Sequence, residues 1–168
     1  MNAGRRSSPG RPLTAAERRL FAAAESVAAN AYAPYSGFRV GAAVTGRPGR
    51  AHLGVNVENA SLPAGLCAER VALGAAVVAG ERELTAVAVA TADGRDAVPC
   101  GACLQALAEF GDPAVVCRLG GELRVLALHE LLTSPFAALA PTDADAARQA
   151  PQRTAGGEGL SPGSRDEL

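Results

Sequence analysis

The apolar positions near the start of the chain follow a helical period. They recur every three or four residues and form a stripe that runs to Pro34. The members of this stripe are Leu20, Phe21, Ala24, Val27, Ala28 and Ala31. Thr14 precedes the stripe, and Glu17 follows Thr14 at the spacing of a capping box. This pattern predicts a helix that begins directly after Thr14.

The pattern then changes to the two-residue alternation of strands. Residues 38–44 and 51–57 read as two strands joined by a glycine-containing turn at 46–49. Further along, the pattern predicts helices at 67–79 and 99–110, strands at 85–90, 114–119 and 123–128, and a short helix at 130–132. The strand at 85–90 is apolar throughout, which is typical of a sheet covered on both faces.

The order of these elements indicates the fold class. Helices alternate with strands, and two strand pairs are joined by short turns, which is expected of a mixed parallel and antiparallel sheet. We therefore expect an α/β protein with a five-stranded mixed sheet between helical layers, that is, three α/β/α layers. No internal repeat is visible in the sequence.

The two ends of the chain differ from its middle. Residues 1–12 and 137–168 are rich in Ala, Gly, Pro and charged residues and lack apolar periodicity, so both are predicted to be disordered. One domain is expected at 13–136. Residues 159–163 match the G-x-S-x-G motif of serine hydrolases, but they lack the preceding strand and the following helix that the motif needs.

Composition excludes several function classes. The chain has 168 residues with 16 basic against 17 acidic side chains, and every basic residue is arginine. Without lysine there is no P-loop and no Schiff-base chemistry. The net charge of −1, the 4% aromatic content and the absence of tryptophan argue against a nucleic-acid partner.

The sequence also predicts a compartment. The longest apolar stretch, at 71–80, is about half of a membrane-spanning helix, so no membrane partner is expected. Arg5 and Arg6 are not followed by the apolar region of an export signal. We expect a cytoplasmic protein, in which its four cysteines are reduced and available for metal binding or catalysis.

Three of the cysteines have the spacing of a metal site. Cys100 and Cys103 form a C-x-x-C motif, and Cys67 lies 33 residues before Cys100. Cys67 and Cys100 each begin a predicted helix, where the helix dipole favours thiolates. Three protein ligands leave the fourth tetrahedral position of zinc open to water, which is the arrangement of catalytic zinc sites.

An acidic residue accompanies these cysteines. Glu69 lies two residues after Cys67, where a carboxylate that does not bind the metal can carry protons for zinc-activated water. C-A-E followed by P-C-x-x-C is the signature of zinc-dependent deaminases, with cysteine in place of histidine.

Four ordered motifs extend this match. They are P-Y-S-G-F-R-V-G-A-A at 34–43, N-V-E-N-A-S at 56–61, C-A-E-R at 67–70 and P-C-G-A-C-L-Q at 99–105. On these motifs the chain, over residues 14–136, resembles the cytidine deaminases of the homotetrameric, three-cysteine kind. The fold implied is that of the cytidine deaminases.

The resemblance implies a role for particular residues. The zinc ligands are Cys67, Cys100 and Cys103, the proton shuttle is Glu69, and Phe38, Asn56, Glu58 and Ala68 hold the nucleoside. Apart from the resemblance, three thiolates on Zn²⁺ leave a net negative centre, and we expect Arg70 to offset this charge through hydrogen bonds to the thiolate sulfur atoms. The implied reaction is hydrolysis of cytidine and deoxycytidine to uridine, deoxyuridine and ammonia by a zinc-bound hydroxide, in pyrimidine salvage. The implied assembly is a homotetramer with shared active sites, in which Phe136 reaches a neighbour's site.

The chain departs from the family pattern at two positions. Leu104 stands where the family usually has arginine, and Leu62 stands where it usually has an aromatic residue. If Leu104 lies beside the cysteines, the zinc site lacks one cation that balances the thiolates. If Leu104 points into the core instead, another arginine, such as Arg39 or one from a neighbour, supplies that charge.

Other interpretations stay open at this point. Cys117 is available as a fourth ligand in a purely structural zinc site. Blasticidin S is an alternative substrate, because its deaminases share the cysteine and glutamate motifs. Phe38 and Phe136 have a second interpretation as ordinary core residues. His52 and His129 have no ligand spacing to the cysteines, and we expect them to be hydrogen-bonded or solvated.

Overall fold

A computed structural model of the chain describes residues 11–46 and 50–136. The predicted tail at 137–168 and the first ten residues of the predicted N-terminal arm lie outside the described residues, as does the G-x-S-x-G match. The domain boundaries proposed from the sequence therefore stay predictions. Within the described part of the chain, no helix is both long and apolar enough to cross a membrane.

The first helix, α1 (Ala15–Val27), begins where the capping box predicts. The Thr14 hydroxyl accepts from the Glu17 amide, and the Glu17 carboxylate accepts from the Thr14 amide at 2.8 Å. The Arg11 guanidinium also pairs with this carboxylate and holds the pKa of Glu17 down at about 2. These contacts satisfy amides that a helix N-terminus otherwise leaves unpaired.

The helical segment ends earlier than its apolar stripe suggests. After α1 a 3₁₀ turn covers Ala28–Asn30, and the chain is extended from Ala31. The Tyr32 amide donates to the Asn56 carbonyl at 3.0 Å, and the Glu58 amide donates to the Tyr32 carbonyl at 2.8 Å. The strand-like pairing of Tyr32, together with the restriction that Pro34 imposes on the residue before it, excludes helix here.

The predicted five-stranded mixed sheet is confirmed. Its strands are β1 (Val40–Thr45), β2 (His52–Val55), β3 (Ala86–Thr91), β4 (Ala114–Leu119) and β5 (Glu122–Ala127), in the order β2-β1-β3-β4-β5. The β3–β4 pair is parallel, and the other three neighbouring pairs are antiparallel.

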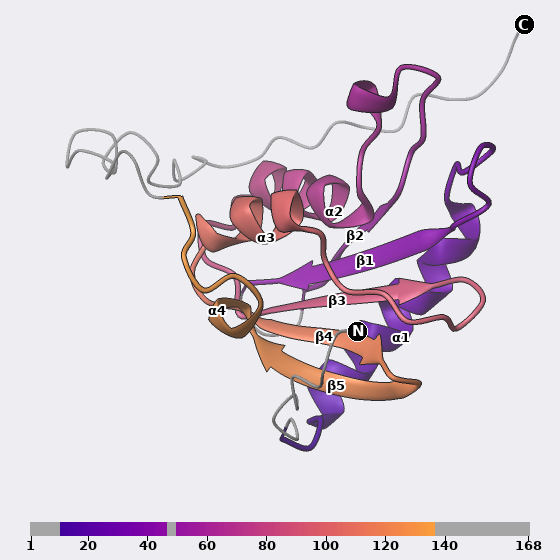
Figure 1. Cartoon of the computed structure of the whole chain (residues 1–168). Helices are drawn as coiled ribbons and strands as arrows, with labels where there is room; N and C mark the ends of the chain where they lie inside the picture. Colours follow the sequence, from indigo (N-terminus) through magenta and orange to yellow (C-terminus); the bar gives the residue numbers. More distant parts are fainter. Residues whose placement is uncertain (1–10, 47–49, 137–168) are drawn as a thin grey trace, which may run out of the picture. The chain divides into compact units, whose positions relative to one another are not determined.

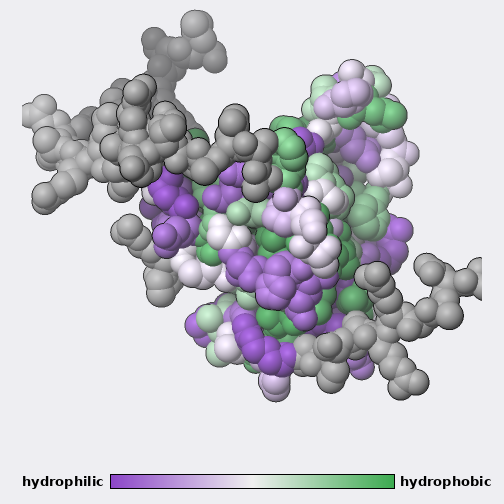
Figure 2. Space-filling model, turned by 60° about the vertical axis from the view of Figure 1, so that its left-hand side comes forward, coloured by the Kyte–Doolittle hydropathy of each residue, from purple (hydrophilic) through white to green (hydrophobic). Residues whose placement is uncertain are grey.

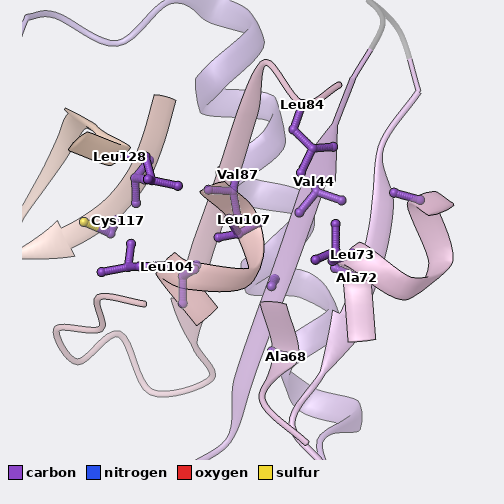
Figure 3. Packing of buried hydrophobic residues seen from close by; sticks show 14 of the residues in the cluster. Val44, Ala68, Ala72, Leu73, Leu84, Val87, Leu104, Leu107, Cys117 and Leu128 are labelled. Atoms are coloured by element: carbon purple, nitrogen blue, oxygen red, sulfur yellow. The ribbon is translucent and has the colours of Figure 1, made fainter. Parts of the chain in front are cut away.

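Helices cover both faces of this sheet, as the apolar strand predicted. Figure 1 shows α1 on one face, with α2 (Ala68–Val78) and α3 (Gly101–Ala108) on the other. Side chains alternate between the two faces along each strand. On β3, Ala86, Ala88 and Ala90 pack with α1, whereas Val87 and Val89 pack in the cluster that contains the buried residues of α2 and α3. Figure 3 shows part of this second cluster, including Leu104, Leu107 and Val87.

Two glycines allow helices to lie directly against the sheet. A Cβ at Gly54 in β2 would lie 2.3 Å from the Ala72 nitrogen and 2.4 Å from the Ala68 oxygen, both in the backbone of α2. A Cβ at Gly41 in β1 would lie 2.1 Å from the Ala24 oxygen of α1. Glycine is required at these positions because backbone meets backbone.

The last element, α4 (Leu128–Leu131), begins two residues before the predicted helix at 130–132. The Asp112 carboxylate accepts from the His129 amide at 3.0 Å, and the Glu130 carboxylate accepts from the Ala127 amide at 2.8 Å. These side chains cap an earlier start than the apolar pattern indicates. A further 3₁₀ turn at Leu62–Ala64 lies in the segment between β2 and α2 and was not predicted.

The contact at Gly54 generates a prediction about stability. Gly54→Ala should lower the free energy of unfolding by about 1–3 kcal/mol, because the new methyl group forces α2 away from β2. Gly74→Ala is the matched control, because Gly74 lies in α2 and no atom lies within 4 Å of the added Cβ. This substitution should raise the free energy of unfolding by about 0.5–1 kcal/mol. Urea unfolding of both variants measures the difference. Equal effects of the two substitutions would show that α2 does not rest on Gly54.

Candidate metal site and adjoining pocket

Three cysteine side chains meet at the start of two helices. Cys67 is the N-cap residue of α2, Cys100 is the N-cap residue of α3, and Cys103 lies in the first turn of α3. Their sulfur atoms all lie within 4.8 Å of one another. Among the described residues this is the cluster in which three metal-ligating atoms come together. Cys117 does not belong to it and lies buried in β4.

Sheet topology explains why these cysteines converge. Strands β2 and β3 both pair antiparallel with β1, so they run in the same direction on either side of it. Helix α2 follows β2 and helix α3 follows β3 in the chain. Both helices therefore start near the same edge of the sheet, which is the usual place for sites in α/β folds.

The residues of this cluster fit zinc. A tetrahedral zinc ion with Zn–S bonds of about 2.3 Å holds its sulfur ligands roughly 3.8 Å apart, within the limit that the three sulfur atoms meet. Thiolates are soft ligands, which favour zinc over magnesium or calcium. With three protein ligands in the cluster, one tetrahedral position is left for a further ligand.

The thiols differ in how readily they ionise in the protein alone. Burial raises the pKa of Cys67 and that of Cys103 above the usual range. Burial also opposes ionisation of Cys100, but hydrogen bonds from the backbone amides of Cys103 and Ala102 and from the thiols of Cys103 and Cys67 together outweigh it and lower the pKa of Cys100. Two of the three thiols thus need a cation to become thiolates, and a bound metal supplies that charge.

A buried carboxyl group lies beside the cysteines. Glu69, in the first turn of α2, is 5% exposed. Burial raises the pKa of Glu69 above its ordinary value, while Cys103 and the charge of Arg70 act in the opposite direction. A carboxyl group with a raised pKa is suited to accept a proton and return it near neutral pH.

Cys67, Cys100 and Glu69 open onto a pocket of about 880 Å³. The pocket brings together most of the residues predicted from the sequence: Phe38, Asn56, Glu58, Cys67, Ala68, Glu69, Arg70 and Cys100 line it. Leu62 lines it as well and is 82% exposed. Leu62 belongs to the segment between β2 and α2, which projects beyond the sheet in Figure 1. The same segment forms the lobe at the upper right of Figure 2.

Asn56 braces one wall of the pocket. Its Oδ1 accepts from the Val40 amide at 2.8 Å, and its Nδ2 donates to the Phe38 carbonyl at 2.9 Å. These two bonds hold the start of β1, where the Phe38 ring is partly buried against the core. The Arg95 guanidinium lies over the same ring, 4.8 Å from its centroid.

Glu58 is held by the segment that precedes Phe38. Its carboxylate accepts from the Tyr35 amide at 2.9 Å, from the Ser36 amide at 3.2 Å and from the Ser36 hydroxyl. The Ser36 hydroxyl and these amides lower the pKa of Glu58, so the carboxylate is ionised and acts as an acceptor.

Three side chains that the sequence analysis considered for the charge balance of the cysteines make other contacts. Leu104 is 5% exposed and packs in the core cluster that includes Leu107 and Cys117 (Figure 3), which is the second of its two interpretations. The Arg70 guanidinium donates to the Gly65 carbonyl at 3.1 Å, in the loop before Cys67. Arg39 donates to the Ala29 carbonyl at 3.5 Å.

The structure also corrects one minor expectation and excludes one alternative interpretation. His52 is buried, and its Nε2 has no hydrogen-bond partner among the described residues, so it is neither solvated nor satisfied; the Glu81 carboxylate lies 3.6 Å away. Phe136 is 74% exposed, which excludes its interpretation as a core residue. His129 pairs with Asp112 at 2.6 Å, as expected of a satisfied histidine.

Sequence reasoning missed Asp96, which also lines the pocket. Its carboxylate accepts from the amides of Gly120 and Gly121, the latter at 3.0 Å, and thereby ties the loop before Cys100 to the β4–β5 turn. The G-G pair marks a turn in the sequence, but nothing in the pattern links that turn to Asp96.

The family model of the cytidine and deoxycytidylate deaminase zinc-binding region matches residues 14–119 of the chain. A cytidine deaminase from Halalkalibacterium halodurans is 41% identical over 111 residues, which cover 64% of this chain and 84% of that protein. A cytidine deaminase from Sporosarcina psychrophila is 36% identical over 121 residues, covering 70% of this chain and 89% of the relative.

Solved structures give the same result. The crystal structure of a cytidine deaminase from Burkholderia pseudomallei is similar with a TM-score of 0.66 and 40% identity, covering 74% of this chain and all of that one. The cytidine deaminase structure from Mycobacterium tuberculosis has a TM-score of 0.63 and 37% identity, covering 71% and 96% of the two chains.

The cluster predicts which cysteines bind the metal. The chain should carry about one zinc ion, and Cys67→Ala should lose it because two sulfur ligands hold zinc poorly. Cys117→Ala removes a buried thiol outside the cluster and should keep the zinc. Elemental analysis of the purified variants measures the metal content. Zinc loss in both variants would support the structural site with four cysteines.

The position of Leu104 predicts a cost for introducing arginine there. Leu104→Arg should lower the free energy of unfolding by about 3–5 kcal/mol, because it buries an unpaired cation in the core. Leu104→Met keeps the volume and should cost less than about 1.5 kcal/mol. Chemical denaturation compares them. A Leu104→Arg variant as stable as the unaltered chain would mean that the side chain at this position faces the cysteines.

Proposed function

Because the chain belongs to the cytidine and deoxycytidylate deaminase family, we propose that it hydrolyses cytidine and deoxycytidine to uridine, deoxyuridine and ammonia. The observation that carries the proposal is the buried Glu69 carboxyl beside three converging cysteines, at the wall of a pocket large enough for a nucleoside. The residues of this pocket then divide into those that hold zinc, those that move protons and those that hold the substrate.

Cys67, Cys100 and Cys103 hold the zinc ion in this proposal. When bound, zinc lowers the pKa of a coordinated water towards neutrality and so supplies the nucleophile at physiological pH. The amides at the start of α3 stabilise negative charge on the Cys100 sulfur, and the dipoles of α2 and α3 favour negative charge at the start of each helix. Arg70, the residue after Glu69 in α2, adds a positive charge near the carboxyl group.

Glu69 moves the protons. It accepts a proton from the attacking water and delivers it to N3 of the pyrimidine ring, which makes C4 more electrophilic. It then takes the proton of the hydroxyl group now on C4 and passes it to the 4-amino group, so that the C4–N bond breaks, ammonia leaves and the C4 carbonyl of the uracil ring forms. The raised pKa of Glu69 supports both directions of transfer, because its acid and base forms are closer in free energy near neutral pH.

The remaining pocket residues bind the nucleoside. The Glu58 carboxylate, kept ionised by Ser36, accepts from a hydroxyl group of the sugar. The Asn56 amide retains one unused N–H and one lone pair for the same sugar. Phe38 supplies an apolar wall, and the Ala68 side of the pocket leaves room for the base.

The assembly belongs to the same proposal. We propose a homotetramer in which Phe136 of one subunit completes the pocket of a neighbour. Phe136 is 74% exposed and is not among the residues that line the pocket of its own chain. In this proposal the protein acts on a small nucleoside in the cytoplasm, in pyrimidine salvage. It binds neither nucleic acid nor a membrane.

One assay tests the substrate class. Ammonia release is measured from cytidine, deoxycytidine, cytosine and blasticidin S under identical conditions. We expect turnover of the two nucleosides and little of the free base, because Asn56 and Glu58 need a sugar to bind. Faster turnover of blasticidin S than of the nucleosides would contradict the proposed substrate and identify the chain as a blasticidin S deaminase. Zinc binding without ammonia release from any of the four compounds would favour a structural zinc domain.

The role of Glu69 generates a further prediction. Glu69→Gln should retain zinc and bind cytidine, but lose turnover by at least about 10²–10⁴-fold, because the amide cannot shuttle protons. Steady-state kinetics, zinc analysis and calorimetric cytidine binding are measured on the same preparation. A variant that keeps a tenth of the original turnover would remove Glu69 from the proton path.

A further inference from the structure

Gln105 makes two hydrogen bonds to the backbone of one distant residue. Its Nε2 donates to the Phe136 carbonyl at 3.0 Å, and its Oε1 accepts from the Phe136 amide at 2.8 Å. Both ends of the side-chain amide are therefore used, and so are both backbone polar groups of Phe136. A primary amide suits this task because it presents a donor and an acceptor side by side.

These two bonds attach an otherwise exposed segment. Leu132 is the last residue that packs against the core, and residues 133–136 are all exposed. Within the described chain, the hydrogen bonds of residues 133–136 are the two to Gln105. The contact holds the backbone of Phe136 while leaving its ring 74% exposed, so the ring is free to contact another molecule.

Gln105 stands two residues after Cys103 on α3. The same short helix thus carries Cys100 and Cys103 at its start and holds the Phe136 segment from the following turn. A shift of α3 would move the metal-ligating sulfur atoms and the Phe136 backbone together.

We propose that Gln105 is a positioning residue that fixes the Phe136 segment to α3 and thereby directs the Phe136 ring into the neighbouring subunit's pocket. This inference rests on the proposed function, in which Phe136 completes a neighbour's site. Gln105 touches no substrate and acts through Phe136 alone. Its effect is therefore on nucleoside binding, whereas the proton transfers at Glu69 proceed as before.

Gln105→Leu removes both hydrogen bonds at nearly constant volume. In the zinc-loaded protein, we expect the KM for cytidine to rise roughly tenfold, since two neutral hydrogen bonds are lost, while kcat changes less than about threefold. Zinc content and oligomeric state stay unchanged. Gln105→Glu keeps the acceptor for the Phe136 amide but repels its carbonyl, and should raise KM as well. Glu109 is the exposed C-cap residue of α3, and Glu109→Gln serves as the control, which should leave KM and kcat unchanged.

A double-mutant cycle separates positioning from support of the helix. Phe136→Ala removes the ring but keeps the backbone that Gln105 holds. If Gln105 acts through the ring, Gln105→Leu has no further effect on KM in the Phe136→Ala background. An equal KM rise in both backgrounds, or loss of zinc from Gln105→Leu, would overturn the proposal, because Gln105 would then support α3 itself.

Hydrogen exchange tests the contact without substrate. The Phe136 amide should exchange at least tenfold faster in Gln105→Leu than in the unaltered protein, while amides of β3 stay protected. Unchanged exchange at Phe136 would overturn the proposal. If the unaltered protein released no ammonia from cytidine, the proposed function would fail, yet the exchange result would still decide whether Gln105 holds Phe136. An active monomer would overturn the neighbour's role directly.

Discussion

The geometry of the site depends on how closely helix α2 lies against strand β2. At Gly54 the two backbones meet with no space for a side chain, which sets the height of α2 above the sheet. Because β2 and β3 run in the same direction on either side of β1, the helices that follow them start at one edge. The Cys67 and Cys100 N-caps meet there, and Cys103 completes the cluster one turn into α3. The position of the metal site thus depends on the shared direction of β2 and β3 and on the absence of a side chain at Gly54.

This arrangement concentrates groups that repel one another when ionised. Burial raises the pKa values of Cys67, Cys103 and Glu69, so in the protein alone it disfavours the ionised form of each of these groups. A divalent cation reverses the balance for the thiols, and the helix dipoles act in the same direction. Glu69 then remains as the buried group of raised pKa next to the pocket, which is the property that proton transfer requires. Leu104, buried in the core, takes no part in this charge balance.

Much of the fold and the site was predictable because it is encoded locally. The Thr14–Glu17 capping box, the continuous apolar run of β3 and the spacing of Cys67, Cys100 and Cys103 are all readable along the chain. What could not be predicted depends on contacts between distant segments. The pairing of Tyr32 with Asn56 shortened the helical segment, the capping of α4 by Asp112 shifted its start, and the Gln105–Phe136 contact has no local signal at all. The orientation of Leu104 was likewise decided by packing, since either face of α3 suits its position in the motif.

The central claim is that three cysteine sulfur atoms hold the metal and leave one position for water. X-ray absorption at the zinc edge measures this directly on the purified protein, because it counts the sulfur and oxygen neighbours of the ion. The account predicts three sulfur neighbours at about 2.3 Å and one oxygen at about 2.0 Å. Four sulfur neighbours, with no lighter atom in the first coordination sphere, would contradict it.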